Sequence, residues 1–288
     1  MMASSAQIMP AGVKQFTVSS WRDGLDQTRD DFVAEEVPVA LVFNGISHAV
    51  MMATPSDLED FALGFALTEG LLASPQELYG VDQQDVPNGI ELNLQVSSAC
   101  EWRLKERRRT LAGRTGCGLC GTDSLSEVRR SLHPVKKCHI SAHALIRAEA
   151  DLRHWQCVQQ MTGATHAAAW VDPDGKILSV REDVGRHNAL DKLIGHLVRH
   201  RARPDAGFLL ITSRASFEMV QKAVVFGAGV LAAVSAPTAL AIEVATAHNL
   251  ALAGYVRGQD FVAYSYPERF SAQVSESTDK EEIEHGHR

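Results

Sequence analysis

Alternating and regularly spaced apolar residues predict an α+β region in the first third of the chain. Two apolar runs within residues 37–53 are joined by Asn44-Gly45, a pair typical of the tight turn of a β-hairpin. A helix is predicted from residue 55 onward, because a proline and acidic residues precede spaced leucine and phenylalanine side chains. Residues 90–96 alternate apolar and polar side chains, as a half-buried strand does. We therefore expect an N-terminal α+β domain over residues 16–100.

The pattern in the second half predicts alternating strands and helices. Residues 166–180 indicate a β-hairpin around an Asp-Pro-Asp-Gly turn, and helices are predicted over 142–161 and 187–200. Next come predicted strands at 207–213, 230–235 and 250–256, which alternate with helices at 217–226 and 238–249. This order requires right-handed crossovers and parallel strands. The expected fold class is therefore α/β, with a C-terminal domain over residues 141–270 built on a mixed or parallel sheet flanked by helices.

Four further segments differ in composition. Residues 1–15 are expected to be a flexible N-terminus, and the polar, aperiodic residues 271–288 a disordered tail. Residues 101–140 combine clustered arginines with a glycine-rich stretch, which predicts a basic segment and a mobile loop. Residues 223–242 carry no charge, but their glycine, proline, serine and threonine residues favour a protein core over a membrane span.

The composition narrows the class of protein. With 45% hydrophobic and 22% charged residues, the 288-residue chain has an ordinary globular composition. Its formal net charge of −7 argues against a protein whose main partner is a nucleic acid. The first residues lack the basic start and apolar run of a secretory signal, so we expect a cytoplasmic protein with no membrane partner. The chain has five cysteines. In a reducing compartment, cysteines are more typical of catalysis, metal binding or packing than of structural disulfides.

The sequence GRTGCGLCG places Cys117 and Cys120 in a nine-residue frame with four glycines. Such a frame suits a mobile loop better than the rigid helix start of a dithiol oxidoreductase, although neighbouring arginines could stabilise a thiolate. An exposed and movable thiolate is what a carrier of persulfide sulfur requires. Unbound surface thiols are the simpler alternative.

A zinc site is a further alternative for the cysteine pair. His133 and Cys138 follow the pair at the spacing of a small zinc finger. The last two ligands of such a finger lie on a helix, and Pro134 directly after the histidine disfavours a helix there. We therefore expect no structural metal, while the zinc hypothesis stays open.

Two further groups of polar residues have the chemistry of a binding site. The first lies in SVREDVGRHNALDK, and its candidates are Arg181, Asp183, His187 and Asn188. The second follows two predicted parallel strands, where free N–H groups favour phosphate, and its candidates are Ser213, Arg214, Ser216 and Thr238. For the first group the alternative is a solvated helix start, and for the second it is ordinary N-cap residues. His166 in TGATHAAA is a further candidate, for which a histidine buried in the core is the alternative. The sequence contains neither a dinucleotide fingerprint nor a Walker loop.

Several of these motifs occur together in one known family. GCGLCG, TGATHAAA, REDVGRHNALDK, SRASFEMVQKA and SAPTALAIEVA, in this order, resemble the FdhD family of formate dehydrogenase accessory sulfurtransferases, as does DFALGFALTEGLL. The resemblance implies that the protein takes persulfide sulfur from a cysteine desulfurase. It would deliver this sulfur to the molybdenum or tungsten bis(molybdopterin guanine dinucleotide) cofactor, which is then inserted into formate dehydrogenase. The resemblance also implies a homodimer and a C-terminal domain similar to the cytidine deaminase fold.

The family motif also implies roles for individual residues. Cys117 would be the persulfide carrier, and Cys120 a helper or second acceptor. A cofactor-contacting stretch of the family is matched by Phe261, Val262, Ala263, Tyr264, Ser265 and Tyr266. Deaminase chemistry is excluded, because no histidine has a glutamate two positions later and Gly116 stands where the motif has proline. A cofactor-binding chaperone without sulfur transfer is the alternative function.

Overall fold

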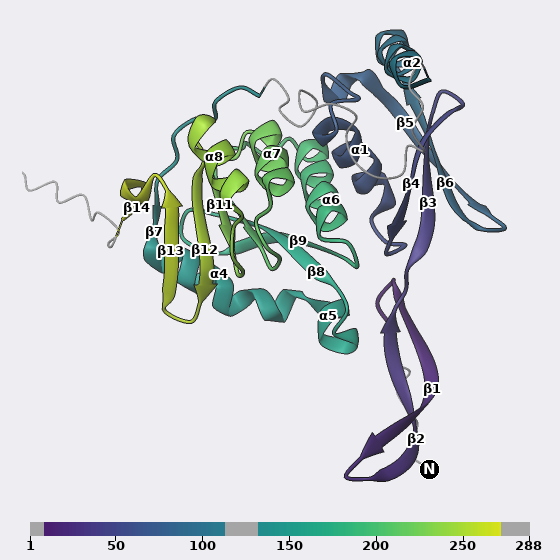
Figure 1. Cartoon of the computed structure of the whole chain (residues 1–288), viewed down its shortest axis with the longest axis vertical. Coiled ribbons are helices and arrows are strands. Elements are labelled where there is room, and N and C mark those ends of the chain that lie inside the picture. Colours follow the sequence, from purple (N-terminus) through teal and green to yellow (C-terminus); the bar gives the residue numbers. More distant parts are fainter. Residues whose placement is uncertain (1–8, 113–131, 272–288) are drawn as a thin grey trace, which may run out of the picture.

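A computed structural model describes residues 9–112 and 132–271 of the chain (Figure 1). The N-terminal part contains β1 (Val13–Arg22), β2 (Leu25–Ala34), β3 (Val37–Phe43), β4 (Ile46–Ala53), α1 (Leu58–Thr68), the 3-10 helix η1 (Pro75–Glu77), β5 (Leu78–Val86), β6 (Gly89–Val96) and α2 (Ser98–Ala112). The C-terminal part contains β7 (Ile140–Ser141), α4 (Ala142–Trp155), α5 (Cys157–Thr162), β8 (His166–Val171), β9 (Ile177–Asp183), α6 (Arg186–Arg199), β10 (Phe208–Ile211), α7 (Phe217–Phe226), β11 (Val230–Ala233), α8 (Ala239–Ala247), β12 (Ala251–Arg257), β13 (Asp260–Ser265), the 3-10 helix η2 (Pro267–Arg269) and β14 (Phe270–Ser271).

The N-terminal part is built around a four-stranded sheet in the order β4-β3-β6-β5. The predicted hairpin is confirmed, since β3 and β4 are antiparallel and Asn44 and Gly45 both have positive φ in the turn. The predicted helix is α1, and the predicted strand at 90–96 lies within β6. Leu41 of β3 and Leu92 of β6 are fully buried in one core with Phe61 of α1. The sheet therefore buries one face against this helix.

Two strands that the sequence analysis did not predict form an arm, β1–β2, which projects from the rest of the molecule (Figure 1). Its antiparallel strands are joined by Asp23 and Gly24, both with positive φ, as in a tight hairpin turn. The arm begins at Val13, inside the segment for which the sequence predicts a flexible N-terminus. Polar residues on both faces of β2 explain why periodicity did not predict the arm, although Asp-Gly is itself a hairpin signal.

The C-terminal part is a six-stranded sheet in the order β13-β12-β11-β10-β8-β9. β10, β11 and β12 are parallel, whereas β8, β9 and β13 pair antiparallel, so the predicted mixed sheet is confirmed. Helices α6, α7 and α8 cover one face and α4 covers the other. Leu209 packs into the first core and its neighbour Leu210 into the second, as alternation along a strand requires. β10 and β11 end, and α7 and α8 begin, at one edge of the sheet, the carboxyl edge.

The helices differ from the prediction in two respects. The helix predicted over 142–161 is divided into α4 and α5, because Gln156 leaves the helical conformation at φ −89° and ψ 72°. Helix α2 was not predicted, since SACEWRLKERRRTLA lacks a continuous apolar stripe, and it occupies the start of the predicted basic segment. Among the described residues, no helix is long and apolar enough to cross a membrane.

Helices α1 and α6 join the two parts of the chain through close backbone contact. A Cβ added at Gly64 would lie 1.8 Å from the carbonyl oxygen of Asp191, and one at Gly195 would lie 1.8 Å from that of Asp60. Only glycine permits this approach at either position. The N-terminal part is therefore packed directly against the helix that leads away from the carboxyl edge.

Candidate functional site

A crevice opens at the carboxyl edge of the C-terminal sheet. Its volume is about 800 Å³, within the range of small-molecule binding sites. His166 stands at the start of β8, while Thr212 and Val234 directly follow β10 and β11. The other lining residues belong to α4, α5 and the turns at their ends: Glu149, Leu152, Arg153, Gln156, Gln159, Gln160, Gly163, Ala164 and Thr165. This is the position where ligands bind in open α/β sheets.

Glu182 of β9 holds the wall of the crevice in place. Its carboxylate accepts hydrogen bonds from the N–H groups of Val158 (2.9 Å) and Gln159 (2.8 Å), at the start of α5. It also accepts a hydrogen bond from the hydroxyl of Thr165 (3.0 Å) in the turn after α5. The acidic side chain therefore satisfies the free N–H groups of a helix start and anchors α5 to the sheet.

Basic and hydroxyl side chains meet where α6 and α7 begin. The Nε2 atom of His187 lies 2.9 Å from the carboxylate of Glu218, which links the first turns of the two helices. The imidazole of His187 lowers the pKa of Glu218. The Nε atom of Arg186 and the hydroxyl of Ser216 are buried and have no hydrogen-bond partner among the described residues. Because buried polar atoms without partners are costly, these two are candidates for contact with a ligand.

His166 lines the crevice and lies close enough to Arg186 and His187 for their charges to act on it. Its main chain pairs with Asp183, and its side chain lines the crevice. Burial lowers the pKa of His166, and the positive charges of Arg186 and His187 lower it further, while Asp183 acts in the opposite direction. An anion bound here would offset the repulsion between the cations and favour the protonated imidazole.

Three candidates from the SVREDVGRHNALDK motif contact the N-terminal part. The buried carboxylate of Asp183 accepts a hydrogen bond from the N–H of Thr54 (3.0 Å). Asn188 donates to a main-chain carbonyl of β4 (2.8 Å), and Arg181 pairs with Asp60 of α1 (2.9 Å). These contacts hold the two parts of the chain together. Cofactor binding by the three residues stays a prediction.

The candidates after β10 and β11 lie at the carboxyl edge. Ser213 is buried, and its hydroxyl donates to the carbonyl of Arg214 (3.2 Å), whose side chain is exposed. Thr238 caps α8, because its hydroxyl accepts from the N–H of Ala241 (3.3 Å). Ser216 precedes α7 in the same way but makes no capping bond. Thr238 is therefore an ordinary N-cap residue. The hydroxyl of Ser216 caps no helix and has no partner among the described residues.

Residues 261–265 lie on β13 and Tyr266 directly follows it, so successive side chains point to opposite faces of the sheet. An added Cβ at Gly254 would touch the ring of Tyr264 and the proline before α8, which places this tyrosine near the carboxyl edge. The hydroxyl of Ser265 is buried and bonded to β12, and Tyr266 donates to a main-chain carbonyl of α8 (2.6 Å). The first half of β13 carries the remaining three, Phe261, Val262 and Ala263. Their contact with a cofactor stays a prediction.

The two cysteines predicted to carry sulfur, Cys117 and Cys120, lie outside the described residues. Of the other two residues in the zinc hypothesis, His133 is exposed, and burial raises the pKa of the half-buried Cys138 thiol. Within residues 9–112 and 132–271, no group of three or more histidine, cysteine, aspartate or glutamate side chains is placed to hold a metal ion. The thiol-carrier and zinc hypotheses both stay predictions.

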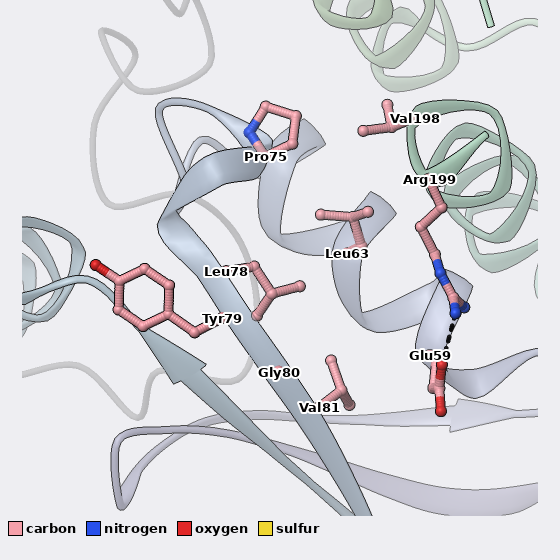
Figure 2. A pocket seen from close by; sticks show the side chains of 9 residues that line it. All are labelled: Glu59, Leu63, Pro75, Leu78, Tyr79, Gly80, Val81, Val198 and Arg199. Carbon is pink, nitrogen blue, oxygen red and sulfur yellow. Dashed lines mark ion pairs between the residues drawn. The ribbon is translucent and has the colours of Figure 1, made fainter. Parts of the chain in front are cut away.

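A second pocket lies between α1, β5 and the end of α6 (Figure 2). Its volume is about 290 Å³, and Leu63, Leu78 and Val198 contribute apolar walls. The charged side chains at its rim, Glu59 and Arg199, pair with each other at 2.9 Å. The crevice is larger and lies beside unpartnered polar atoms. We therefore place the candidate site at the crevice.

Gln156, which lines the crevice, was not among the candidate residues from the sequence. No local pattern marks Gln156, because its position depends on the break between α4 and α5. Arg186 lies inside the quoted motif, next to His187, and the structure places it at the start of α6, as the charge pattern of the motif indicates.

Known proteins resemble this chain in sequence and in fold. The model of the FdhD/NarQ family matches residues 34–271. A protein of Variovorax paradoxus named sulfur carrier protein FdhD is 57% identical over 242 residues, which cover 84% of this chain and 87% of the relative. A protein of the same name from Cupriavidus necator is 51% identical over 274 residues, 95% of each chain. A crystal structure from Desulfotalea psychrophila, of a protein assigned to the formate dehydrogenase accessory proteins, covers 90% of this chain and 99% of its own, with a TM-score of 0.72 and 21% identity, which shows a shared fold. The chain therefore belongs to the FdhD/NarQ family.

Proposed function

We propose that the chain is a sulfur carrier that accepts sulfur as a persulfide on Cys117 from a cysteine desulfurase. The observation that carries this proposal is family membership over residues 34–271, with relatives named sulfur carrier proteins at 51% and 57% identity. The thiolate of Cys117 would attack the outer sulfur of the donor persulfide. A new S–S bond then forms on Cys117, and the donor cysteine leaves as a thiolate.

The proposed acceptor is the molybdenum or tungsten bis(molybdopterin guanine dinucleotide) cofactor that formate dehydrogenase requires. The outer sulfur would pass to this cofactor and take two electrons from its reduced metal to become sulfide, while the S–S bond breaks and Cys117 leaves as a thiolate, with Cys120 as a helper. The crevice supports the proposal, because its volume suits one nucleotide end of such a substrate. Arg186 and Ser216 offer unpartnered polar atoms for the phosphates.

The C-terminal domain is further proposed to be similar to the cytidine deaminase fold. The six-stranded mixed sheet with helices on both faces is compatible with this proposal. The residues of deaminase chemistry are absent from the sequence, so the same type of crevice would serve to bind a nucleotide.

The proposed assembly is a homodimer in the cytoplasm, with formate dehydrogenase as the client. The arm supports the dimer, because Phe16, Leu25 and Val33 share one of its faces and are 51%, 63% and 41% exposed. A two-stranded ribbon is marginally stable in water unless something packs on it. A second copy of the chain could cover this face. A reducing compartment would keep Cys117 available as a thiol.

Intact mass spectrometry tests the sulfur-carrier proposal. Wild type, Cys117→Ala and Cys120→Ala are incubated with a cysteine desulfurase and cysteine, and then treated with a reductant. The proposal expects a gain of about 32 Da that the reductant removes in wild type and in Cys120→Ala, and no gain in Cys117→Ala. A wild-type chain that gains no sulfur would favour a cofactor-binding chaperone, for which the crevice is sufficient.

A further inference from the structure

The second pocket, between α1, β5 and the end of α6, is an apolar hollow at the molecular surface (Figure 2). Leu63 of α1 and Leu78 and Val81 of β5 point into it, and Val198 lies across from them on α6 (Figure 2). β5 is an outer strand of the described four-stranded sheet, so no neighbouring strand of that sheet shields this edge. An apolar side chain of a partner would leave water on entering the pocket, which favours binding. The pocket is therefore suited to anchor another protein.

Two basic segments flank the second pocket. Residues 98–112, which form α2, contain five lysines and arginines against two glutamates, and residues 199–203 contain three arginines and no acidic residue, so each segment has a formal charge of +3 in a chain with a net charge of −7. Arg103 ties α2 to the pocket through Glu77, whose neighbours in η1 and β5 line it, and Arg199 lines the other side. Acidic partners neutralise these two arginines, so the excess charge lies on the rest of the two segments. A partner with an acidic surface is therefore the complementary one.

The position of α2 limits where a sulfur donor can bind. α2 ends at Ala112, and Cys117 follows five residues later. Five residues of chain span at most about 18 Å, so a donor must bring its own cysteine close to the end of α2. Arg103, which contacts the wall of the second pocket through Glu77, lies about 14 Å along the helix from Ala112. A stable interface covers about 800 Å² of each partner, a patch about 30 Å across, so a donor at the end of α2 is large enough to reach the pocket.

We propose that the second pocket and the two basic segments form the docking surface for the protein that donates persulfide sulfur. This inference rests on the proposed function, which makes Cys117 the acceptor of that sulfur. The donor places an apolar side chain in the pocket, and acidic side chains around it face residues 98–112 and 199–203. Helix α6 begins beside the crevice at Arg186 and ends at Arg199, about 20 Å away. The surface that meets the donor is therefore separate from the crevice.

Binding of the full chain to a cysteine desulfurase, measured by biolayer interferometry without cysteine, tests this surface. Val81→Glu places a carboxylate in the second pocket, and the matched control Val86→Glu makes the same change on the same strand outside the pocket. We expect Val81→Glu to weaken binding about ten-fold, because an apolar contact is lost and a like charge meets the acidic surface of the donor. Val86→Glu should bind as wild type does. Inorganic polysulfide, which needs no docking surface, should load Cys117 equally in all three chains.

Three results would overturn the docking surface: unchanged affinity in Val81→Glu, an equal loss in Val86→Glu, or a wild-type affinity that does not fall as salt is raised, since the charged contacts should be screened. If Val81→Glu does not fold, as judged by circular dichroism, Pro75→Glu makes the same comparison at an exposed position that lines the pocket. A wild-type chain that gains no sulfur from the desulfurase would contradict the proposed function itself. Normal wild-type loading with an unaffected Val81→Glu would contradict only the docking surface.

Discussion

Replacing Lys222 by methionine is expected to destabilise the junction between the two parts of the chain. The ammonium group of Lys222 lies 2.9 Å from each carboxylate oxygen of Asp191, from the hydroxyl of Thr68 and from the carboxylate of Glu69. The side chains of Lys222 and Asp191 are 6% and 1% exposed, so solvent screens their attraction little. Burial acts to lower the pKa of Lys222, but the carboxylates of Asp191 and Glu69 outweigh it and leave this pKa raised.

The substitution leaves the carboxylate of Asp191 buried without a countercharge. Breaking a buried pair in this way costs about 3–5 kcal/mol, which corresponds to a fall in Tm on the order of 10 °C. Burial raises the pKa of Asp191, and without Lys222 no ammonium group opposes it. A group whose pKa is raised by folding stabilises the protein at low pH and loses that contribution as the pH rises through the raised pKa. The destabilisation should therefore be smaller at about pH 5 than at about pH 8.

Thermal unfolding followed by circular dichroism measures this effect. The matched control is the double variant Lys222→Met with Asp191→Leu, which removes both charges and should recover most of the lost Tm. A single variant that melts within about 1 °C of wild type would refute the reasoning, since the pair would then contribute little. A double variant whose loss equals the sum of the two single losses would refute the coupling.

Three other predictions follow from particular contacts. Gly195→Ala should lower the free energy of unfolding by about 3 kcal/mol, because its Cβ would lie 1.8 Å from the carbonyl oxygen of Asp60; denaturant titration measures this, and wild-type stability would contradict the close packing of α1 and α6. Arg186→Gln should raise the pKa of His166, because a nearby positive charge is removed; NMR titration of the imidazole would contradict this if the pKa stayed the same or fell. Phe16→Asp should convert the proposed dimer into a monomer, because it places a charge on the apolar face of the arm; light scattering that still finds a dimer would exclude this face as the interface.

Elements that depend on local chemistry were predictable from the sequence. The hairpin turn at Asn44-Gly45 follows from two residues that tolerate positive φ, and the predicted helix at 217–226 matches α7, which ends where Gly227 adopts the left-handed conformation. The break at Gln156 was not predictable. It depends on Glu182, which lies on another strand and takes the N–H groups at the start of α5.

The order of strands and helices was enough to place the carboxyl edge. It did not show which roles the residues near this edge have. Arg181, Asp183 and Asn188 have the composition of a ligand site. Their partners are Asp60 of α1, Thr54, and Met52 of β4, which lie 121 to 136 positions earlier in the chain. Neither periodicity nor spacing reports contacts at such separations, so the sequence did not distinguish a binding group from an internal contact.

Transfer of labelled sulfur tests the central claim most directly. The chain is loaded with radiolabelled sulfur by a cysteine desulfurase, separated from the donor, and mixed with the cofactor and formate dehydrogenase that lacks it; Cys117→Ala is the matched control. The account predicts that label leaves the wild-type chain and appears in the cofactor, and that the variant delivers none. Label that stays on the chain while the cofactor remains unlabelled, or equal delivery by Cys117→Ala, would contradict the account.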